Sequence, residues 1–461
     1  MGEARMQTSQ GAPNFPVGFG LPYWLDLPRA RFDAIDEDID TDALVIGAGI
    51  FGLKVAHYLS QQGVGCIILD AGQVGDGASG RNQGSVNHSG SMSYIDAIHR
   101  YGRDRARAIW QLGLENHRMI REQLEEYKVD CSYRVAGCYF LARRDIPDCE
   151  ANLIAFRRDY DLLHEDGFAV DHIDEADALR ATGNGVFAGG VKYLTDAQFH
   201  SGQYVIGLAQ GVARQASVRL FENSRVSGIE RRGDITEVRV GGRTVRASLV
   251  FMGVNALAPQ WVPFLDSALR AERGQVLVTE PLPDRPCTGS FGTAMAWWRE
   301  IEEPDGRFRL LFGGGRVRDE PDSLFHQFTA DGRPNNKLET DGFSPSVAHQ
   351  HRLDRQFRLL FPQYSKMRIS HRWGGLQSFT ADGFPEVGLF DEERRIYGAA
   401  GFCGRGNCYS DVAAAYVTGL ALRRSALLDK RYCTVVEQLM QVGRSAAAWR
   451  PWASDDENMS V

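Results

Sequence analysis

The hydrophobic pattern of residues 42–70 has three parts. Residues 42–46 form a short apolar run followed by glycine, which predicts a buried strand of a parallel sheet. Residues 52–62 carry apolar side chains at helical spacing, and Gly63 follows them where a helix should end. Residues 66–69 form a second apolar run that ends at Asp70. The pattern therefore predicts a strand–helix–strand unit.

The rest of the chain divides into regions that differ in hydrophobic pattern and composition. Residues 1–37 show no periodicity, and 71–91 form a glycine-rich loop. Residues 329–346 form a polar loop rich in Gly, Pro and Asn, and 94–128 have the apolar spacing of an amphipathic helix. Shorter elements begin at residue 131. We expect helices at 148–167, 199–216 and 410–427, and strands within 131–142 and at 218–221, 226–229, 237–240, 249–252, 275–280, 294–299, 309–313 and 395–399.

A GxGxxG motif joins the first predicted strand to its helix. Gly47 permits a tight turn, Gly49 lets the backbone approach a pyrophosphate, and Gly52 lets the helix pack closely on the strand. Asp70, at the end of the next strand, is placed to accept hydrogen bonds from a ribose. The unit predicts dinucleotide binding, and by itself leaves NAD and FAD as alternatives.

Composition excludes several classes of protein. The 461 residues include 52 Lys and Arg against 59 Asp and Glu, a net charge of −7 with both signs interspersed, which argues against a nucleic-acid surface. The longest apolar runs are far shorter than the ~20 residues of a membrane span, and no signal-peptide pattern opens the chain. The eight cysteines have no metal-like spacing. We expect a cytoplasmic enzyme with reduced thiols and no metal site.

A set of ordered motifs then favours FAD. The loop Gly77-Ala-Ser-Gly-Arg-Asn-Gln-Gly84 resembles the GASGRNGG stretch of the D-amino-acid-oxidase-like (DAO) family of FAD-dependent oxidoreductases. Further blocks that match in order are 198–226, 273–280, 312–316, 372–385 and 401–406. The resemblance covers about residues 23–427, and the Tyr23-Trp24 opening is similar to the group of glycine and γ-glutamylputrescine oxidases.

The resemblance implies an α/β fold with two interleaved domains. A Rossmann-type FAD-binding domain would comprise 38–130, 194–256 and 371–430, and a mixed-sheet α+β substrate domain 131–193 and 257–370. Residues 1–37 would be an irregular N-terminal arm and 431–461 a C-terminal tail.

The resemblance also implies which residues bind FAD. Gly375 stands where several relatives carry a cysteine bonded to the flavin, so we expect the FAD to be non-covalent. The implied cofactor-binding residues are Gly47, Gly49, Ile50, Phe51, Gly52, Asp70, Ala71, Ser79, Arg81, Asn82, Gln83, Gly84, Val226, Gly401, Gly404, Arg405 and Gly406.

Substrate-contacting residues are harder to assign. Trp297 and Trp298 lie on a predicted strand, so at most one faces the ligand; we take Trp298, with His88 and Arg316, as candidate catalytic residues. Cys408 replaces a carboxylate-binding lysine of sarcosine-oxidase-like relatives. Arg316, or alternatively Arg299 or Arg405, would then bind an acidic group of the substrate.

The implied reaction is FAD-dependent oxidation of the C–N bond of an amine or amino acid to an imine, which water hydrolyses. In the first reading O₂ takes the electrons and becomes H₂O₂. Two alternatives remain open, a dehydrogenase with a quinone or protein acceptor and a flavin-binding subunit of a complex without its own turnover. The sequence shows no pattern that indicates an oligomeric state.

Overall fold

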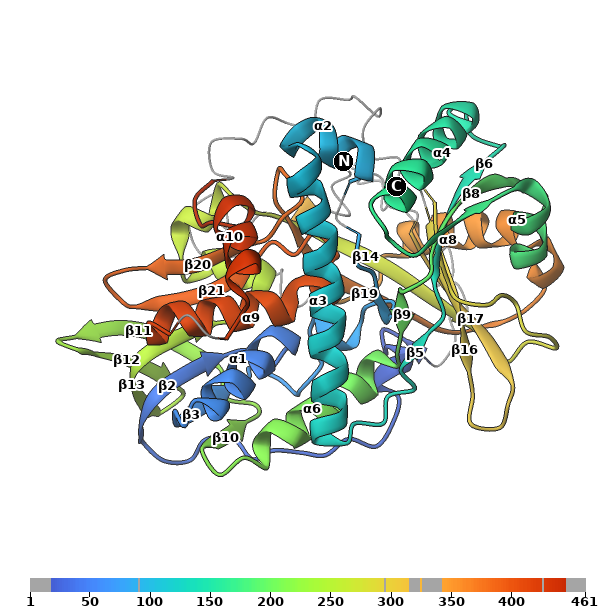
Figure 1. Cartoon of the computed structure of the whole chain (residues 1–461). Helices are drawn as coiled ribbons and strands as arrows, with labels where there is room; N and C mark the ends of the chain where they lie inside the picture. Colours follow the sequence, from blue (N-terminus) through green and yellow to red (C-terminus); the bar gives the residue numbers. More distant parts are fainter. Residues whose placement is uncertain are drawn as a thin grey trace, which may run out of the picture.

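Two large sheets organise the chain (Figure 1). The computed structural model describes residues 18–89, 92–293, 296–314, 324–325, 342–424 and 427–444. Both sheets are built from segments that lie far apart in the sequence, so neither corresponds to one continuous stretch of chain.

The eight-stranded sheet contains the predicted strand–helix–strand unit. β2 (Ile39–Ile46) lies parallel to β3 (Cys66–Leu69) on one side and to β13 (Arg243–Met252) on the other. β3 pairs in parallel with β10 (Val218–Phe221), and β13 with β21 (Ile396–Ala400). Antiparallel strands β11 (Val226–Arg232), β12 (Ile235–Val240) and β20 (Glu386–Asp391) complete the sheet.

Helices cover this sheet in layers (Figure 1). α1 (Ile50–Gln61), α6 (Ser201–Ala213) and α9 (Gly406–Leu422) pack beside the strands, and α3 (Arg103–Tyr127) crosses α6 and α9. Lys54 of α1 and Asp411 of α9 form a fully buried ion pair. α10 (Lys430–Leu439), which lies within the predicted tail, packs on α3 and α9.

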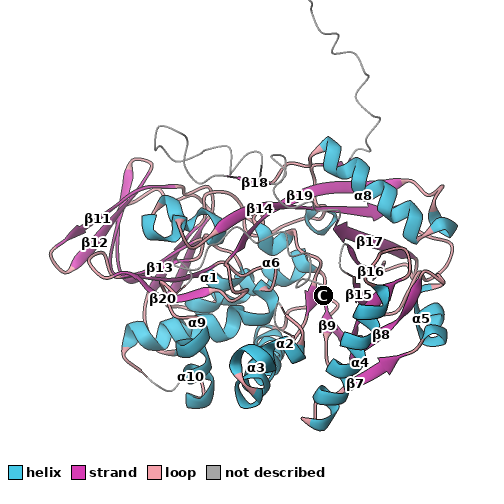
Figure 2. Cartoon of the chain, turned by 90° about the horizontal axis from the view of Figure 1, so that it is seen from above, coloured by secondary structure: helices cyan, strands magenta, loops and turns pink. Residues whose placement is uncertain are grey.

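The ten-stranded sheet is mixed. Its order is β1 (Gly18–Phe19), β19 (Ile369–Phe379), β14 (Arg270–Thr279), β17 (Phe308–Gly314), β16 (Ala296–Glu302), β15 (Ser290–Gly292), β6 (Cys138–Arg143), β8 (Phe187–Tyr193) and β7 (Val170–Ile173), with β18 (Leu324–Phe325) on β14. Figure 2 shows α8 (Val347–Leu360) beside β14 and β17, and α4 (Cys149–Glu165) and α5 (Glu175–Thr182) beside β7 and β8.

Short elements join the two sheets. β4 (Ser85–Val86), β9 (Ala197–Gln198) and β5 (Arg134–Val135) form a three-stranded sheet. The 3₁₀ helices are η1 (Tyr23–Leu25), η2 (Ala78–Gly80), η3 (Asn255–Gln260), η4 (Pro263–Asp266) and η5 (Pro362–Tyr364).

These sheets confirm the predicted fold class, a Rossmann-type α/β part with a mixed-sheet part. The limits of the two domains stay a prediction, although β19 joins the ten-stranded sheet while its residues from 371 onward were assigned to the FAD-binding domain. The predicted helix over 94–128 is in fact two helices, α2 (Tyr94–Tyr101) and α3. Gly102 separates them with a φ of 85°, which a helix interior does not tolerate.

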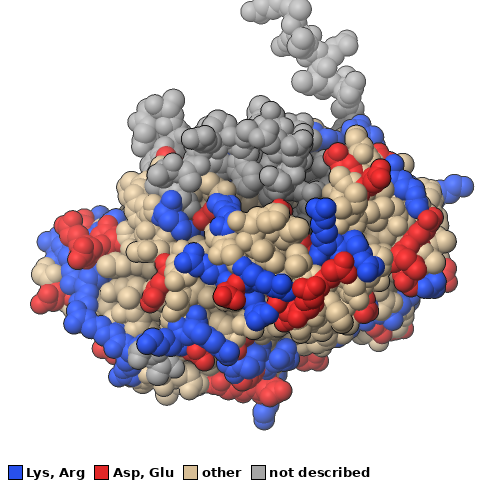
Figure 3. Space-filling view, turned by 45° about the horizontal axis from the view of Figure 1, so that its top comes forward, with Lys and Arg blue, Asp and Glu red and all other residues tan. Residues whose placement is uncertain are grey.

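The surface agrees with the charge pattern of the sequence. On the face in Figure 3, Lys and Arg alternate with Asp and Glu without a large field of one sign. No helix among the described residues is sufficiently long and apolar to cross a membrane.

Candidate functional site

A cavity of about 1150 Å³ lies where the two sheets meet. One end is lined by the glycine turn after β2 and by residues at the ends of β3 and β13; the other is lined by β6, β15, β16 and β19. This volume exceeds the 300–1,000 Å³ typical of small-molecule sites, so the cavity has room for a dinucleotide and a second, smaller ligand.

The glycine turn has the geometry that the motif predicts. Gly47 has a φ of 102°, and a Cβ there would lie 2.8 Å from the carbonyl oxygen of Gly253. A Cβ on Gly52 would overlap the carbonyl oxygen of Gly47, which shows how closely α1 approaches the turn. The first turn of α1 contains no acidic residue, so its positive end faces the cavity uncompensated, as phosphate binding requires.

Asp70 lines the same end and also shapes it. Its Oδ2 accepts a hydrogen bond of 2.8 Å from the backbone N–H of Ala48, and its Oδ1 accepts one of 2.9 Å from that of Gly72. Burial raises the pKa of this carboxyl, against the effect of these two donors. Each carboxylate oxygen can accept a further hydrogen bond from a ribose hydroxyl.

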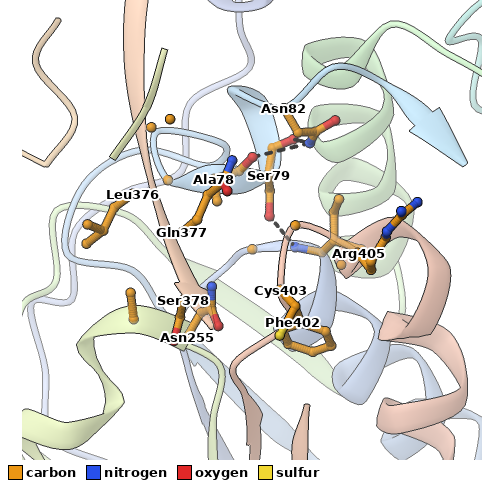
Figure 4. A pocket seen from close by; sticks show the side chains of 18 of the residues that line it. Ala78, Ser79, Asn82, Asn255, Leu376, Gln377, Ser378, Phe402, Cys403 and Arg405 are labelled. Atoms are coloured by element: carbon orange, nitrogen blue, oxygen red, sulfur yellow. Dashed lines mark hydrogen bonds between the residues drawn. The ribbon is translucent and has the colours of Figure 1, made fainter. Parts of the chain in front are cut away.

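The loop that resembles the flavin-contacting stretch is fixed by its own polar side chains (Figure 4). Ser79 Oγ accepts a 2.9 Å hydrogen bond from the N–H of Ile50 and so ties the loop to the start of α1. Asn82 donates to the carbonyl oxygen of Ser79 at 2.7 Å, and its own oxygen accepts from the N–H of Gly84. The conformation of the loop is therefore held by hydrogen bonds within the protein.

Arg81 links this loop to the ten-stranded sheet. Its guanidinium donates to the carbonyl oxygens of Asp76, Phe343 and Gly374. Burial lowers its pKa to about 10. Because its donors are used by backbone acceptors, Arg81 positions the loop.

The turn that precedes α9 forms a third wall. Gly401 donates to Asn255 Oδ1 at 3.0 Å, and Gly404 has a φ of 74°. Arg405 follows at the N-cap of α9, half-buried, and none of the described carboxylates forms an ion pair with it. Burial raises the pKa of the adjacent Cys408 thiol to about 11, against the positive charge of Arg405. Figure 4 shows the Arg405 side chain extending away from Leu376 and Gln377.

Most of the predicted cofactor-binding residues line the cavity, while Gly52, Gly84 and Gly401 lie behind its wall and shape the turns. Those on the wall are Gly47, Gly49, Ile50, Phe51, Asp70, Ala71, Ser79, Arg81, Asn82, Gln83, Val226, Gly404, Arg405 and Gly406. Gly375 also lines it, so this position, where the resemblance implied a possible flavin-bonded cysteine, has no thiol.

The two tryptophans of β16 have opposite environments. Trp298 is fully buried among Phe187, Phe291 and Phe312 and does not line the cavity. Trp297 is the one that lines the cavity. The structure thus places Trp297, and not the chosen Trp298, on the cavity wall. Strand alternation shows that the two side chains point to opposite faces, and packing shows which face is the core.

His88 is enclosed behind the wall. It is 1% exposed, and its Nδ1 lies 2.6 Å from Oδ1 of the buried Asp196. The neighbouring Asn87 lines the cavity instead. The structure thus places His88, a predicted catalytic residue, off the cavity wall.

The three candidate arginines differ in where they lie relative to the cavity. Arg299 is buried and donates to the carbonyl oxygens of Gly84 and Phe199, each at 2.9 Å, so it holds the loop in place. Arg316 lies outside the described residues. Arg405 is thus the one of the three that the described structure places on the cavity wall.

Several wall residues were not singled out from the sequence. They are Asn87, Met92, Asn255, Phe291, Gln377, Ser378 and Asn407. Asn255 could have been predicted from the sequence, because it follows β13. Ligands in open α/β sheets bind beyond the carboxyl ends of the strands.

The site fits FAD on its own geometry. The glycine turn, the N-terminus of α1 and Asp70 suit the phosphates and ribose of a dinucleotide. Deeper in the cavity, Oγ of Ser378 and Oγ of Ser410 are enclosed wall atoms without a hydrogen-bond partner among the described residues. Such atoms are expected where a polar ligand completes the site.

Comparisons with known proteins agree with this geometry. The chain is 27% identical over 405 residues to γ-glutamylputrescine oxidoreductase of Escherichia coli, which covers 85% of this chain and 86% of the relative. Glycine oxidase of Geobacillus kaustophilus has a similar fold, with a TM-score of 0.67 and 18% identity over 85% of this chain and 97% of its own. L-proline dehydrogenase of P. horikoshii also has a TM-score of 0.67, with 16% identity over 88% of this chain and 100% of its own.

The model of one protein family, DAO, described as FAD dependent oxidoreductase, matches residues 42–420. That span includes the glycine turn, Asp70, the 77–84 loop and the turn before α9. The recognition from sequence, the enzyme class and the FAD cofactor are thereby confirmed. The protein belongs to the DAO family of FAD-dependent oxidoreductases.

Proposed function

We propose that the protein oxidises the C–N bond of an amine that also carries an acidic or polar group, and passes the electrons to O₂. The observation that carries the proposal is one cavity that joins the dinucleotide turn to an aromatic wall and to Arg405, which forms no ion pair with a described carboxylate. Phe140, Phe291 and Trp297 line the apolar part of that wall, and Arg405 lies on the same cavity.

The wall favours the reactive form of an amine. An alkyl ammonium has a pKa near that of lysine, ~10.4, so only about 0.1% is neutral at pH 7. An apolar wall and a nearby positive charge both penalise the ammonium form and lower that pKa. Arg405 and the aromatic residues therefore support oxidation of a neutral amine without requiring a dedicated base.

Bound FAD would supply the electron acceptor for a hydride equivalent from the carbon next to the nitrogen. The nitrogen lone pair forms the C=N bond as the hydride leaves, and water then hydrolyses the imine to a carbonyl compound and an amine or ammonia. The two electrons finally reduce O₂ to H₂O₂.

Arg405 supports an acidic group on the substrate. A half-buried guanidinium without a carboxylate partner among the described residues favours an anionic ligand. The named substrate of the Escherichia coli relative, γ-glutamylputrescine, combines an amine with a glutamyl group. Arg316 stays a predicted second anchor.

A dehydrogenase is the second candidate. The L-proline dehydrogenase of P. horikoshii has the same TM-score as the glycine oxidase, so the fold does not select the electron acceptor.

Anaerobic addition of α-amino acids, ω-amino acids, diamines and N-acyl diamines should bleach the flavin absorbance with at least one of them. Admission of air should then restore the colour quickly and release one H₂O₂ for each flavin reoxidised. Slow reoxidation in air with fast reoxidation by a quinone would instead support the dehydrogenase. If no amine bleaches the flavin, the proposed reaction is wrong.

A further inference from the structure

Asn87 contributes a hydrogen-bonding group to the substrate end of the cavity. It lies just after β4, is half-buried and lines the wall that also includes Cys138, Phe291 and Trp297. It is a polar residue in an otherwise largely apolar stretch of wall, so the orientation of its amide determines which chemical group can bind next to it.

Asp196 fixes that orientation. The Asn87 side-chain nitrogen donates to Asp196 Oδ2 at 2.9 Å. Burial disfavours ionisation of Asp196, but the charge and hydrogen bond of His88, with the hydrogen bond of Asn87, outweigh it and lower its pKa. An ionised carboxylate can only accept hydrogen bonds, so it must face the NH₂ group of Asn87.

Asp196 is in turn held rigidly. It is 1% exposed, and its Oδ1 accepts from the backbone N–H of His88 at 3.0 Å and lies 2.6 Å from His88 Nδ1. Its backbone oxygen accepts from the N–H groups of Ala136 and Gly137 at the start of β6. The carboxylate therefore cannot turn away from Asn87.

The amide oxygen of Asn87 is left for a ligand. No hydrogen bond to it is found within the described ranges, and it is not one of the enclosed unpartnered atoms, whereas His88 Nε2 is. Asn87 Oδ1 is therefore accessible, and the space beside this residue is the cavity. An accessible carbonyl oxygen with a fixed direction is an acceptor for N–H or O–H donors.

Asn87 and Arg405 act on the same region. Burial and the charge of Asp196 raise the pKa of Cys138, while a hydrogen bond from Asn87 and the charge of Arg405 oppose the rise. Asn87, Cys138 and Arg405 all line the same cavity, so one ligand can meet both the amide and the cation.

We propose that Asn87 Oδ1 accepts a hydrogen bond from the reacting amine, and that Asp196 is the positioning residue that turns the amide into this orientation. The inference rests on the proposed function and narrows the substrate to an amine with at least one N–H before oxidation, bound with its acidic group toward Arg405. A tertiary amine would leave this acceptor unmatched.

The test compares ligands that differ only in the amine. The probes are glycine, 4-aminobutyrate and 6-aminohexanoate, each beside the acid without nitrogen: acetate, butyrate and hexanoate. Binding of the acids is measured by perturbation of the flavin spectrum, and the amines by the concentration dependence of anaerobic flavin reduction. The variants are Asn87→Leu, Asp196→Asn and their double mutant, with Asp159→Asn as control.

Asp159 is a matched control because it is also a buried carboxylate that accepts two backbone N–H groups, those of Tyr94 and Ile95, but does not line the cavity. Asn87→Leu should weaken the amines roughly two- to tenfold, the range for a hydrogen bond between two neutral groups, and leave the acids unchanged. Asp196→Asn should have the same selective effect, since an asparagine at 196 can donate to the Asn87 oxygen and turn the amide.

The double mutant should lose no more than Asn87→Leu alone, because both changes remove one interaction. The inference is overturned if the variants weaken amines and acids equally, if Asp159→Asn shows the same selectivity, or if the losses add. If none of the three amines reduces the native flavin, while other amines do, the substrate orientation inferred here is wrong. If no amine of any class does, the proposed function fails with it.

Discussion

Replacing Asp70 with asparagine should weaken FAD binding while leaving the rest of the fold intact. The two carboxylate oxygens of Asp70 each accept a backbone N–H, from Ala48 at 2.8 Å and from Gly72 at 2.9 Å. An amide has one oxygen, so asparagine would turn its NH₂ group toward one of these donors. The glycine turn would lose one contact, and the predicted ribose site would lose its negative charge.

The expected magnitude follows from these contacts. A hydrogen bond to a charged group contributes about 1.5–3 kcal/mol. Loss of one such bond at the ligand corresponds to roughly a ten- to hundred-fold rise in Kd. We expect the midpoint of thermal unfolding of the apo-protein to change less than that of the holo-protein, because only the latter includes the ligand's stabilisation.

The assay is titration of apo-protein with FAD, followed by quenching of flavin fluorescence. Asp42→Asn is the matched control, since Asp42 also accepts a backbone N–H, that of Gly65 at 3.1 Å, but lies in the N-terminal half of β2 and outside the cavity wall. Equal Kd values for Asp70→Asn and the native protein would refute the role of Asp70, and a parallel loss in Asp42→Asn would indicate a general effect on the sheet.

Three further outcomes follow from the structure. Acid precipitation should leave yellow FAD in the supernatant, as expected for a non-covalent cofactor, and colour in the pellet would contradict this. Gly52→Ala should lower flavin content and the thermal midpoint because its Cβ would overlap the oxygen of Gly47, whereas Gly185→Ala, with open space around it, should change neither. Lys54→Met should cost about 3–5 kcal/mol in unfolding free energy by leaving Asp411 as an unpaired buried charge, measured by denaturant unfolding, and Lys54→Met with Asp411→Leu should recover much of it.

The strand–helix–strand unit could be predicted from sequence because its signals are local. The glycines, the apolar runs and Asp70 all belong to one segment of about 30 residues and can be recognised without knowledge of the rest of the chain. β3 occupies the predicted residues 66–69. β19 was not predicted as a strand. Its sequence includes polar residues and the pair Gly374–Gly375, and it becomes a strand through long pairing with β14, which no local pattern reveals.

At the substrate end of the cavity, the sequence likewise does not show which of two neighbouring residues faces the cavity. Trp297 and Trp298, and likewise Asn87 and His88, are neighbours of which one faces the cavity and the other is enclosed. Local periodicity separates the two members of each pair, but the choice depends on what packs behind the wall. For His88 that is Asp196, which is 108 residues away in sequence.

The order of strands in the eight-stranded sheet bears on how the protein is made. β2 pairs with β13, which in turn pairs with β21, and α9 packs on α1 through the Lys54–Asp411 pair. When residues 39–70 have left the ribosome, the glycine turn has been made, but β13, β21 and α9 have not. Such distant pairings delay folding, because the entropy of closing a long loop is lost before the stabilising contacts form. Flavin uptake is therefore a late event in biogenesis, and a nascent chain that stops before β21 presents an incomplete nucleotide site to the cell.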